Sequence, residues 1–280
     1  MSRLEGRTVL VTGAGGAIGR AIAVALADRG ARLVLAGRTI ATLEQTAGAL
    51  GGDGHRTLAL DVGNGDDWTA AASELAGVTD VVAAAAVLNP VGPIGSYDPA
   101  EFWGTMQINV LGTLLAVHHT LPGLRAARGS VVVFSGGGAT KPLRRYDAYA
   151  TSKAATVRLS ENLAVELEDD GIRVNAIAPG FVASAMHEVT LDAGAGAAGD
   201  AYFAETRKNL DKGGVPPERS AELVATLLDP AGPAVTGRLI SAEWDPWEDP
   251  EFFAAMAASA DLGRLRRVDD VFITTVSESA

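Results

Sequence analysis

The sequence predicts a single α/β domain built on a doubly wound parallel sheet. Short apolar runs rich in β-branched residues alternate with longer helical patterns along the 280-residue chain. This alternation is typical of strand–helix–strand units, in which helices cover both faces of a parallel sheet. The runs are continuously apolar, as expected of strands buried on both faces. Hydrophobic residues make up 48% of the chain, enough for a substantial core.

The pattern also places the individual elements. Strands are expected at 8–11, 32–36, 57–60, 78–86, 130–134 and 172–178. Helices are expected at 18–29 and 40–50, near 98–127 and near 150–169. Residues 184–216 are rich in Ala and Gly and predict a mobile lid loop with some short helix. The expected organisation is therefore a domain over residues 1–243 that contains this lid, followed by a C-terminal extension over 244–280, packed on the domain or on a neighbouring subunit.

Composition and charge exclude several classes of protein. The net charge is −11 and no Lys/Arg-rich block occurs, which argues against binding nucleic acid or an anionic membrane. The absence of cysteine excludes disulfides, thiolate catalysis and cysteine–zinc sites. The histidines lack ligand spacing, so we expect no catalytic metal; they are His55, His118, His119 and His187. With no apolar signal segment and no apolar stretch of membrane-spanning length, we expect a cytoplasmic protein.

A glycine-rich turn follows the first strand. Residues 12–19 read Thr-Gly-Ala-Gly-Gly-Ala-Ile-Gly, and the first helix opens there. Glycines allow a tight turn and a close approach of the backbone to a pyrophosphate, which the N–H groups of the helix N-terminus then bind. Any tight strand–helix turn can use glycines, but this position in an α/β chain favours a Rossmann-type dinucleotide site. Its expected contacts are Gly13, Gly15, Gly16, Ile18 and Gly19.

The end of the second strand bears on the choice of cofactor. An acid that binds the ribose 2′-hydroxyl of NAD normally stands here, but the chain has Leu35-Ala36-Gly37-Arg38. A guanidinium at Arg38 can bind a 2′-phosphate, so we expect NADP, with NAD possible. The alternative is that Arg38 is only a surface charge. Asp61 and Val62 close the third strand, where the carboxylate either accepts from the adenine amino group or serves as a loop acid.

Tyr149 and Lys153 form the candidate catalytic pair. Their spacing of four residues places both on one face of the predicted helix. An ammonium beside a phenol favours the phenolate, so we expect Lys153 to lower the pKa of Tyr149 and make it an acid/base. Tyr146 lies seven residues from Lys153, so the spacing selects Tyr149.

These motifs together resemble the short-chain dehydrogenase/reductase family. The glycine turn, Asn109, the Tyr149–Lys153 pair and Asn175-Ala-Ile-Ala-Pro-Gly180 occur in the family order over about residues 5–243. The resemblance implies hydride transfer between nicotinamide and a carbonyl/alcohol pair. Tyr149 would exchange the proton, Lys153 would hold the nicotinamide ribose and Asn109 would support a water relay. Further cofactor contacts would come from Ala84, Ala85, Pro179, Gly180, Val182 and Ser184. The resemblance also implies a homodimer or homotetramer, with the helix at 150–169 in the interface.

Two departures from the family pattern matter. The usual Asn-Asn-Ala-Gly after the fourth strand is replaced by Ala84-Ala85-Ala86-Val87. The family serine, thirteen residues before the tyrosine, is replaced by Gly136. We expect Ser135 to take its role through a one-residue loop shift; alternatives are Thr140, a backbone N–H of the glycine run, or no catalytic role for Ser135. A cofactor-binding scaffold with little redox activity therefore stands as the alternative function.

The sequence leaves the substrate open. Met186, Tyr202 and Phe203 lie in the expected lid and are candidate pocket contacts, and Trp244 and Trp247 are candidates for its mouth. Such a partly apolar pocket is compatible with sugars, polyketides, steroids or simple ketones.

Overall fold

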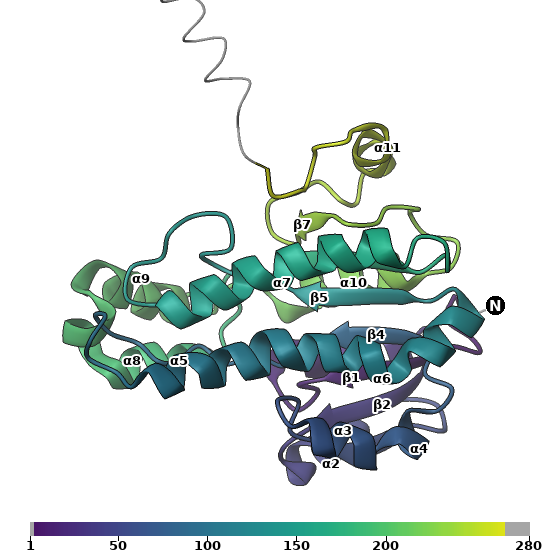
Figure 1. Ribbon diagram of the computed structural model, residues 1–280, viewed down its shortest axis with the longest axis horizontal. Helices are drawn as coiled ribbons and strands as arrows, with labels where there is room; N and C mark the ends of the chain where they lie inside the picture. The colour runs from purple at the N-terminus through teal and green to yellow at the C-terminus, as the bar shows by residue number, and fades with distance from the viewer. Residues whose placement is uncertain (1–2, 267–280) are drawn as a thin grey trace, which may run out of the picture.

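The computed structural model describes residues 3–266 and confirms the predicted α/β fold (Figure 1). Seven parallel strands form one sheet in the order β3-β2-β1-β4-β5-β6-β7. The strands are β1 (Thr8–Thr12), β2 (Arg32–Gly37), β3 (Arg56–Ala59), β4 (Asp80–Ala83), β5 (Ser130–Phe134), β6 (Arg173–Ala178) and β7 (Leu239–Ser241). β4 is shorter than the predicted strand at 78–86 because residues 84–89 leave the sheet and line a cleft at its edge.

Helices cover both faces of the sheet. They are α1 (Ala17–Ala27), α2 (Ile40–Ala47), α3 (Gly65–Ala70), α4 (Ala72–Leu75), α5 (Pro99–Met106), the π-helix η1 (Gln107–Leu111), α6 (Gly112–Ala127), α7 (Asp147–Glu166), α8 (Ala185–Ala198), α9 (Asp200–Asp211), α10 (Pro217–Leu228) and α11 (Pro250–Ala258). Successive residues of β1 point to opposite faces: Val9 and Val11 pack into the core with α1 and α10, and Leu10 into the core with α6 and α7. Of the helices in residues 3–266, none is long and apolar enough to cross a membrane.

The sheet order reverses between β1 and β4. From β1 the chain adds β2 and then β3 on one side, and from β4 it adds β5, β6 and β7 on the other. The connections leaving β1 and β4 therefore run in opposite directions and open a crevice at the carboxyl ends of these strands. In doubly wound sheets this is where ligands bind.

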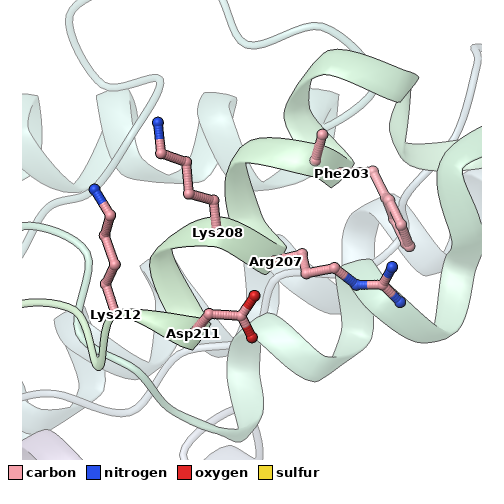
Figure 2. Close-up of a pocket in the computed structure, with 6 residues that line it drawn as sticks. Phe203, Arg207, Lys208, Asp211 and Lys212 are labelled. Atoms are coloured by element: carbon pink, nitrogen blue, oxygen red, sulfur yellow. The ribbon is translucent and has the colours of Figure 1, made fainter.

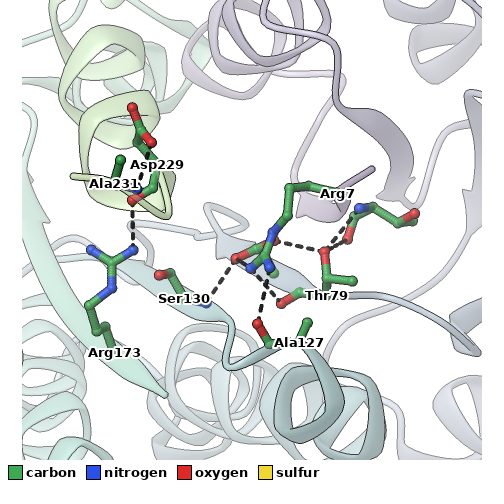
Figure 3. Close-up of polar contacts among 9 residues, drawn as sticks. Arg7, Thr79, Ala127, Ser130, Arg173, Asp229 and Ala231 are labelled. Atoms are coloured by element: carbon green, nitrogen blue, oxygen red, sulfur yellow. Dashed lines mark hydrogen bonds and ion pairs between the residues drawn. The ribbon is translucent and has the colours of Figure 1, made fainter. Parts of the chain in front are cut away.

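A buried polar network ties the opposite, amino-terminal edge together (Figure 3). Asp80, at the start of β4, is fully buried and is paired with the guanidinium of Arg7. Its carboxylate also accepts from the Ser130 N–H at 2.8 Å and the Thr79 hydroxyl at 2.8 Å. Because these partners satisfy the buried charge, the network fixes β4 and β5 in register beneath the crevice.

Residues 184–216 are mostly helical, so the predicted lid loop was wrong in its local structure. Alanine-rich residues form the helix α8, and the glycines only interrupt it. Gly194 has a φ of 76° inside α8, and Gly199 has a φ of 87° at its end. These left-handed positions kink α8 and turn the chain into α9, which lies beside α8 in Figure 1.

The C-terminal segment packs on its own domain and covers the free edge of β7. The Leu239 N–H in β7 donates to Gly263 O at 2.6 Å, and Arg238 donates to Ser259 O at 2.7 Å. Glu161 of α7 accepts from the Leu265 N–H at 2.6 Å. Residues 267–280 of the expected extension lie outside the described residues.

Candidate active site

A cleft of about 460 Å³ opens at the carboxyl ends of β1 and β4. It brings together most of the predicted cofactor-binding residues: Gly13, Gly15, Gly16, Ile18, Gly19, Arg38, Asp61, Val62, Ala84, Ala85 and Ser184. The sequence analysis missed Thr39, Thr42 and Leu60, which also line the cleft. Thr39 and Thr42 lie at the start of α2, directly after Arg38. Their closeness to Arg38 along the chain was the signal that could have identified them as cleft residues.

The glycine turn forms a cradle in which side chains do not fit. Gly13 has a φ of +68°, and a Cβ there would lie 2.8 Å from the Ala85 nitrogen. A Cβ at Gly15 would collide with the Thr42 hydroxyl, and one at Gly19 with the Gly13 carbonyl. Gly16 precedes α1 with no side-chain cap, and the first turn of α1 has no acidic residue. The first N–H groups of α1 are therefore available to a phosphate, and the cradle fits a dinucleotide.

The adenosine end of this cleft carries both charges expected from the sequence. Arg38 is exposed and makes no ion pair or hydrogen bond with another residue of the 3–266 range. The Asp61 carboxylate accepts from the Gly63 N–H at 2.9 Å, so one oxygen already stabilises its own loop. The loop-acid interpretation of Asp61 thus has a structural contact, and an additional adenine contact remains a prediction.

Tyr149 and Lys153 lie together on α7 and are both buried. The Lys153 Nζ is 5.6 Å from the centroid of the Tyr149 ring. It donates to Phe134 O, at the end of β5, at 2.9 Å. The amine is thus fixed between the phenol and the end of the strand.

Burial controls the acidity of this pair. It lowers the pKa of the Lys153 ammonium to about 8. It also raises the pKa of Tyr149 well above its usual value, and the nearby Tyr202 raises it further. The expected lowering of the Tyr149 pKa by Lys153 was therefore wrong for this structure, in which the loss of hydration on burial is the largest influence on the phenol. Tyr149 is a neutral phenol here.

Asn109 links the pair to the loop after β4. It lies in the π-helix η1, a helix type often found at functional sites. Its Nδ2 donates to Val87 O and to the Ser152 hydroxyl, each at 2.9 Å, and its Oδ1 accepts from the Val87 N–H at 2.8 Å. Ser152 in turn donates to Tyr149 O at 2.7 Å. The Asn109 side chain thus braces the 84–87 loop, which lacks the family's asparagines.

Gly136 lies beside the Tyr149 phenol, and Ser135 makes no hydrogen bond to it. The Ser135 N–H donates to Ile177 O at 2.8 Å, which continues the β5–β6 pairing by one residue. The Ser135 hydroxyl is buried and makes no hydrogen bond with residues 3–266. A Cβ at Gly136 would overlap the Tyr149 hydroxyl. The expected loop shift that brings Ser135 to Tyr149 is therefore absent, because sheet pairing holds the segment in register.

Residues 184–216, the lid predicted from the sequence, contribute to an apolar cluster that contains Tyr149. Leu88, Tyr146, Tyr149 and Ala198 form its buried centre, against which Met186, Tyr202 and Phe203 pack. The three residues predicted as pocket contacts thus pack against the cluster that contains Tyr149. The two tryptophans predicted at the pocket mouth do not join this cluster: Trp247 is buried in the core with α1 and α10, and Trp244 is 79% exposed.

The remaining residues predicted to bind the cofactor do not line the cleft. They are Tyr149, Lys153, Pro179, Gly180 and Val182. Val182 is buried and forms a bridge with Gly214, so the base of the lid covers this end. A separate hollow of about 390 Å³ lies along α9, with Phe203, Arg207, Lys208, Asp211 and Lys212 around it (Figure 2). It contains none of the predicted cofactor-binding residues.

Comparisons with known proteins agree with this geometry. The family model described as short chain dehydrogenase matches residues 7–193. The chain is 35% identical over 207 residues to D-threitol dehydrogenase from Mycolicibacterium smegmatis, a match that covers 71% of this chain and 78% of the relative.

Solved structures with bound nicotinamide cofactors have the same fold. One is a 3-ketoacyl-(acyl-carrier-protein) reductase from Brucella melitensis complexed with NADH, with a TM-score of 0.72, 26% identity and coverage of 85% of this chain and 97% of that one. Another, from Beutenbergia cavernae, is described as a putative NAD(P)-dependent gluconate 5-dehydrogenase with NADP at low occupancy. It has a TM-score of 0.72, 28% identity and coverage of 85% and 96%.

Proposed function

Since this chain belongs to the short-chain dehydrogenase/reductase family and is an NAD(P)-dependent oxidoreductase, we propose that it interconverts a carbonyl and a secondary alcohol with NADP(H), with Tyr149 as the acid/base. The observation that carries this proposal is the buried Tyr149–Lys153 pair on α7, joined through Ser152 to Asn109 and to the loop that lines the glycine cleft. A catalytically idle scaffold has no physical need for this set of contacts.

The chain's own groups divide the work of a reduction as follows. The glycine cleft would hold the nicotinamide cofactor, which when bound would supply the hydride for the carbonyl carbon or accept it in the reverse reaction. Tyr149 donates its hydroxyl proton to the carbonyl oxygen, since burial keeps the phenol neutral. Lys153 is mostly protonated at neutral pH and stabilises the tyrosinate that forms. Tyr149 then regains a proton from solvent. In alcohol oxidation each of these transfers is reversed.

The NADP preference rests on charge at the adenosine end. Arg38 projects from the end of β2 without a protein partner among residues 3–266, and Thr39 and Thr42 stand beside it in the cleft lining. No carboxylate occupies positions 36 or 37 to bind a ribose 2′-hydroxyl or to repel a 2′-phosphate. The relatives include both an NADH and an NADP complex, so the proposed preference depends on this chain's own residues.

One experiment tests the function as a whole. NADPH and NADH are titrated by fluorescence, and turnover of a panel of aliphatic, cyclic and aromatic ketones and secondary alcohols is followed at the nicotinamide absorbance. We expect binding of NADPH and turnover of at least one substrate. Tyr149→Phe should keep the binding and lose the turnover. Binding with no turnover anywhere in the panel would favour the scaffold alternative, for which the unpartnered Ser135 hydroxyl is the supporting observation.

The assembly is proposed from the exposed apolar side chains at η1, α6 and α7. Leu111 and Leu114 are 37% and 40% exposed, and Val165 is 70% exposed. α6 and α7 run side by side on one face of the molecule (Figure 1). Exposed apolar side chains of this size favour burial against another subunit. We therefore propose a homodimer or homotetramer that uses this face, to be tested by analytical ultracentrifugation of the protein and of Leu114→Glu.

A further inference from the structure

The hydroxyl groups of the tyrosines separate into two kinds. The chain has four tyrosines, all within the described residues. Tyr97 donates its hydroxyl to the Asp147 carboxylate at 3.1 Å, and Tyr146 donates to the Thr190 hydroxyl at 3.0 Å. The hydroxyls of Tyr149 and Tyr202 make no hydrogen bond within residues 3–266, and the same apolar cluster contains both side chains. These two hydroxyls, without a protein partner among the described residues, are therefore free to donate to a substrate.

This region lacks the polar group that carbonyl chemistry requires. A ketone oxygen that gains negative charge is best stabilised by two donors, and Tyr149 is only one of them. Position 136 has no side chain, and a Cβ there would overlap the Tyr149 hydroxyl. Ser135 is held in register with β6 and is 3% exposed. Neither position 135 nor position 136 thus provides a hydroxyl that is hydrogen-bonded to Tyr149.

The lid holds Tyr202 in a defined position. Its ring packs on the ring of Tyr146 with centroids 4.7 Å apart, and Tyr146 is itself fully buried and fixed by Thr190. The turn between α8 and α9 is held by Arg145, which donates to Ala197 O at 3.1 Å. Arg145 comes from the segment just before α7, so the lid helix that carries Tyr202 is anchored close to the catalytic tyrosine.

We propose that Tyr202 is a further catalytic residue, whose hydroxyl donates the second hydrogen bond to the substrate carbonyl oxygen from the lid side. The proposal rests on the carbonyl/alcohol function proposed above. In reduction the hydride bonds to the carbonyl carbon, the C=O π electrons pass to the oxygen, and Tyr149 transfers its proton there. Tyr202 keeps its own proton throughout and lowers the energy of the developing oxyanion.

The raised pKa values of Tyr149 and Tyr202 agree with their roles as proton donor and hydrogen-bond donor. Burial raises the pKa of Tyr202 to about 12, and the charges of Tyr146 and Glu205 add to the shift. Tyr202 is therefore a neutral donor over the working pH range. Both side chains pack in one apolar cluster, and Tyr202 adds to the rise that burial causes in the pKa of Tyr149. No direct hydrogen bond joins the two hydroxyls among residues 3–266, so each can donate to a substrate oxygen.

The test compares Tyr202→Phe with Tyr97→Phe. Both variants remove one hydroxyl and keep the ring, but the Tyr97 hydroxyl is bonded to Asp147, outside the apolar cluster that contains Tyr149. The ketone of the panel that the enzyme reduces fastest is the probe, with NADPH saturating. We expect Tyr202→Phe to lower kcat about 100-fold with an unchanged melting temperature, as the loss of one oxyanion donor does. Tyr97→Phe should keep kcat within about threefold.

Ser135→Ala and Tyr149→Phe complete the test. A wild-type kcat in Tyr202→Phe would overturn the proposal, and a large loss in Ser135→Ala would then assign the second donor to β5. If both variants keep the wild-type kcat while Tyr149→Phe is inactive, the carbonyl function stands without the Tyr202 role. If the wild-type protein reduces no ketone and oxidises no alcohol, the function itself fails, and the Tyr202 role fails with it.

Discussion

Asn109 and Val87 are joined by two hydrogen bonds, in which the side-chain amide of Asn109 pairs with both backbone groups of Val87. The two residues are 22 positions apart, yet this contact fixes the loop that leaves β4 against η1. Ala84, Ala85, Ala86 and Val87 all line the cofactor cleft, so the contact bears on both stability and binding.

We therefore expect Asn109→Ala to lower both the unfolding free energy and the affinity for NADPH. It leaves the N–H and C=O of Val87 and the Ser152 hydroxyl without this partner, at a cost of about 2–4 kcal/mol in unfolding free energy. Urea unfolding measures this cost, and an NADPH titration should show weaker binding as the loop loses its brace. Ser152→Ala is the matched control, because it removes only one of the three Asn109 bonds, together with the bond from Ser152 to Tyr149 O, and keeps both bonds to Val87. Equal stability of Asn109→Ala and the wild-type protein would contradict the bracing role.

Lys153 should give the folded protein a distinctive pH dependence. Its pKa is about 8 in the folded protein, against an ordinary value of 10.5 that the unfolded chain retains. The unfolded chain thus binds this proton more tightly, so stability rises with pH between about 8 and 10.5 and is reduced below that window. The difference amounts to about 3 kcal/mol across the window. Tyr149, with a raised pKa, acts in the opposite direction only above its usual pKa near 10.

Urea unfolding of the wild-type protein and Lys153→Met at pH 7, 8, 9 and 10 isolates this contribution. Lys153→Met should be the more stable of the two at pH 7, and the wild-type protein should regain the difference as the pH rises. Parallel curves for the two proteins would show that the ammonium is not desolvated in the folded state.

The sequence predicted the fold well because that fold depends on local patterns. Each apolar run with its following helix is specified within about 30 residues, and the crevice follows from the order of these units. The glycine turn was predictable for the same reason, since Gly13 and Gly19 contact residues of their own turn or of the neighbouring strand end.

Features set by long-range packing were not predictable. The composition of the lid indicated a loop, but contacts of Tyr146 with Thr190 and Tyr202 support helices there. The raised pKa of Tyr149 comes from its burial in the folded protein, and the four-residue spacing from Lys153 along α7 does not predict that burial. The separation of Ser135 from Tyr149 is decided by pairing with Ile177 on a strand more than 40 residues away.

Arg38 should determine the choice between NADP and NAD. If its guanidinium binds the 2′-phosphate, Arg38→Ala should raise the KM for NADPH about 10- to 100-fold and leave the KM for NADH nearly unchanged. The comparison uses steady-state kinetics with each cofactor at a fixed substrate concentration. Arg3→Ala is the control, since Arg3 is also an exposed arginine (78%) but lies outside the cleft. An equal change in KM for NADPH and NADH would mean that Arg38 acts only as a general surface charge.

Gly19 and Gly16 provide a graded test of the cradle. A Cβ at Gly19 would collide with the Gly13 carbonyl and crowd Ala14, both of which are backbone that cannot move without opening the turn. At Gly16 the nearest atom to a Cβ is the Gly13 carbonyl at 3.4 Å, and the φ of −83° suits any residue.

We expect Gly19→Ala to weaken NADPH binding by more than about 100-fold and to lower the melting temperature, since a displaced turn no longer presents the N–H groups of α1. Gly16→Ala should cause a much smaller loss of affinity and little loss of stability. Fluorescence titration with NADPH and thermal unfolding, measured on both variants, give the comparison. Equal affinities in the two variants would mean that the cofactor does not lie over this turn.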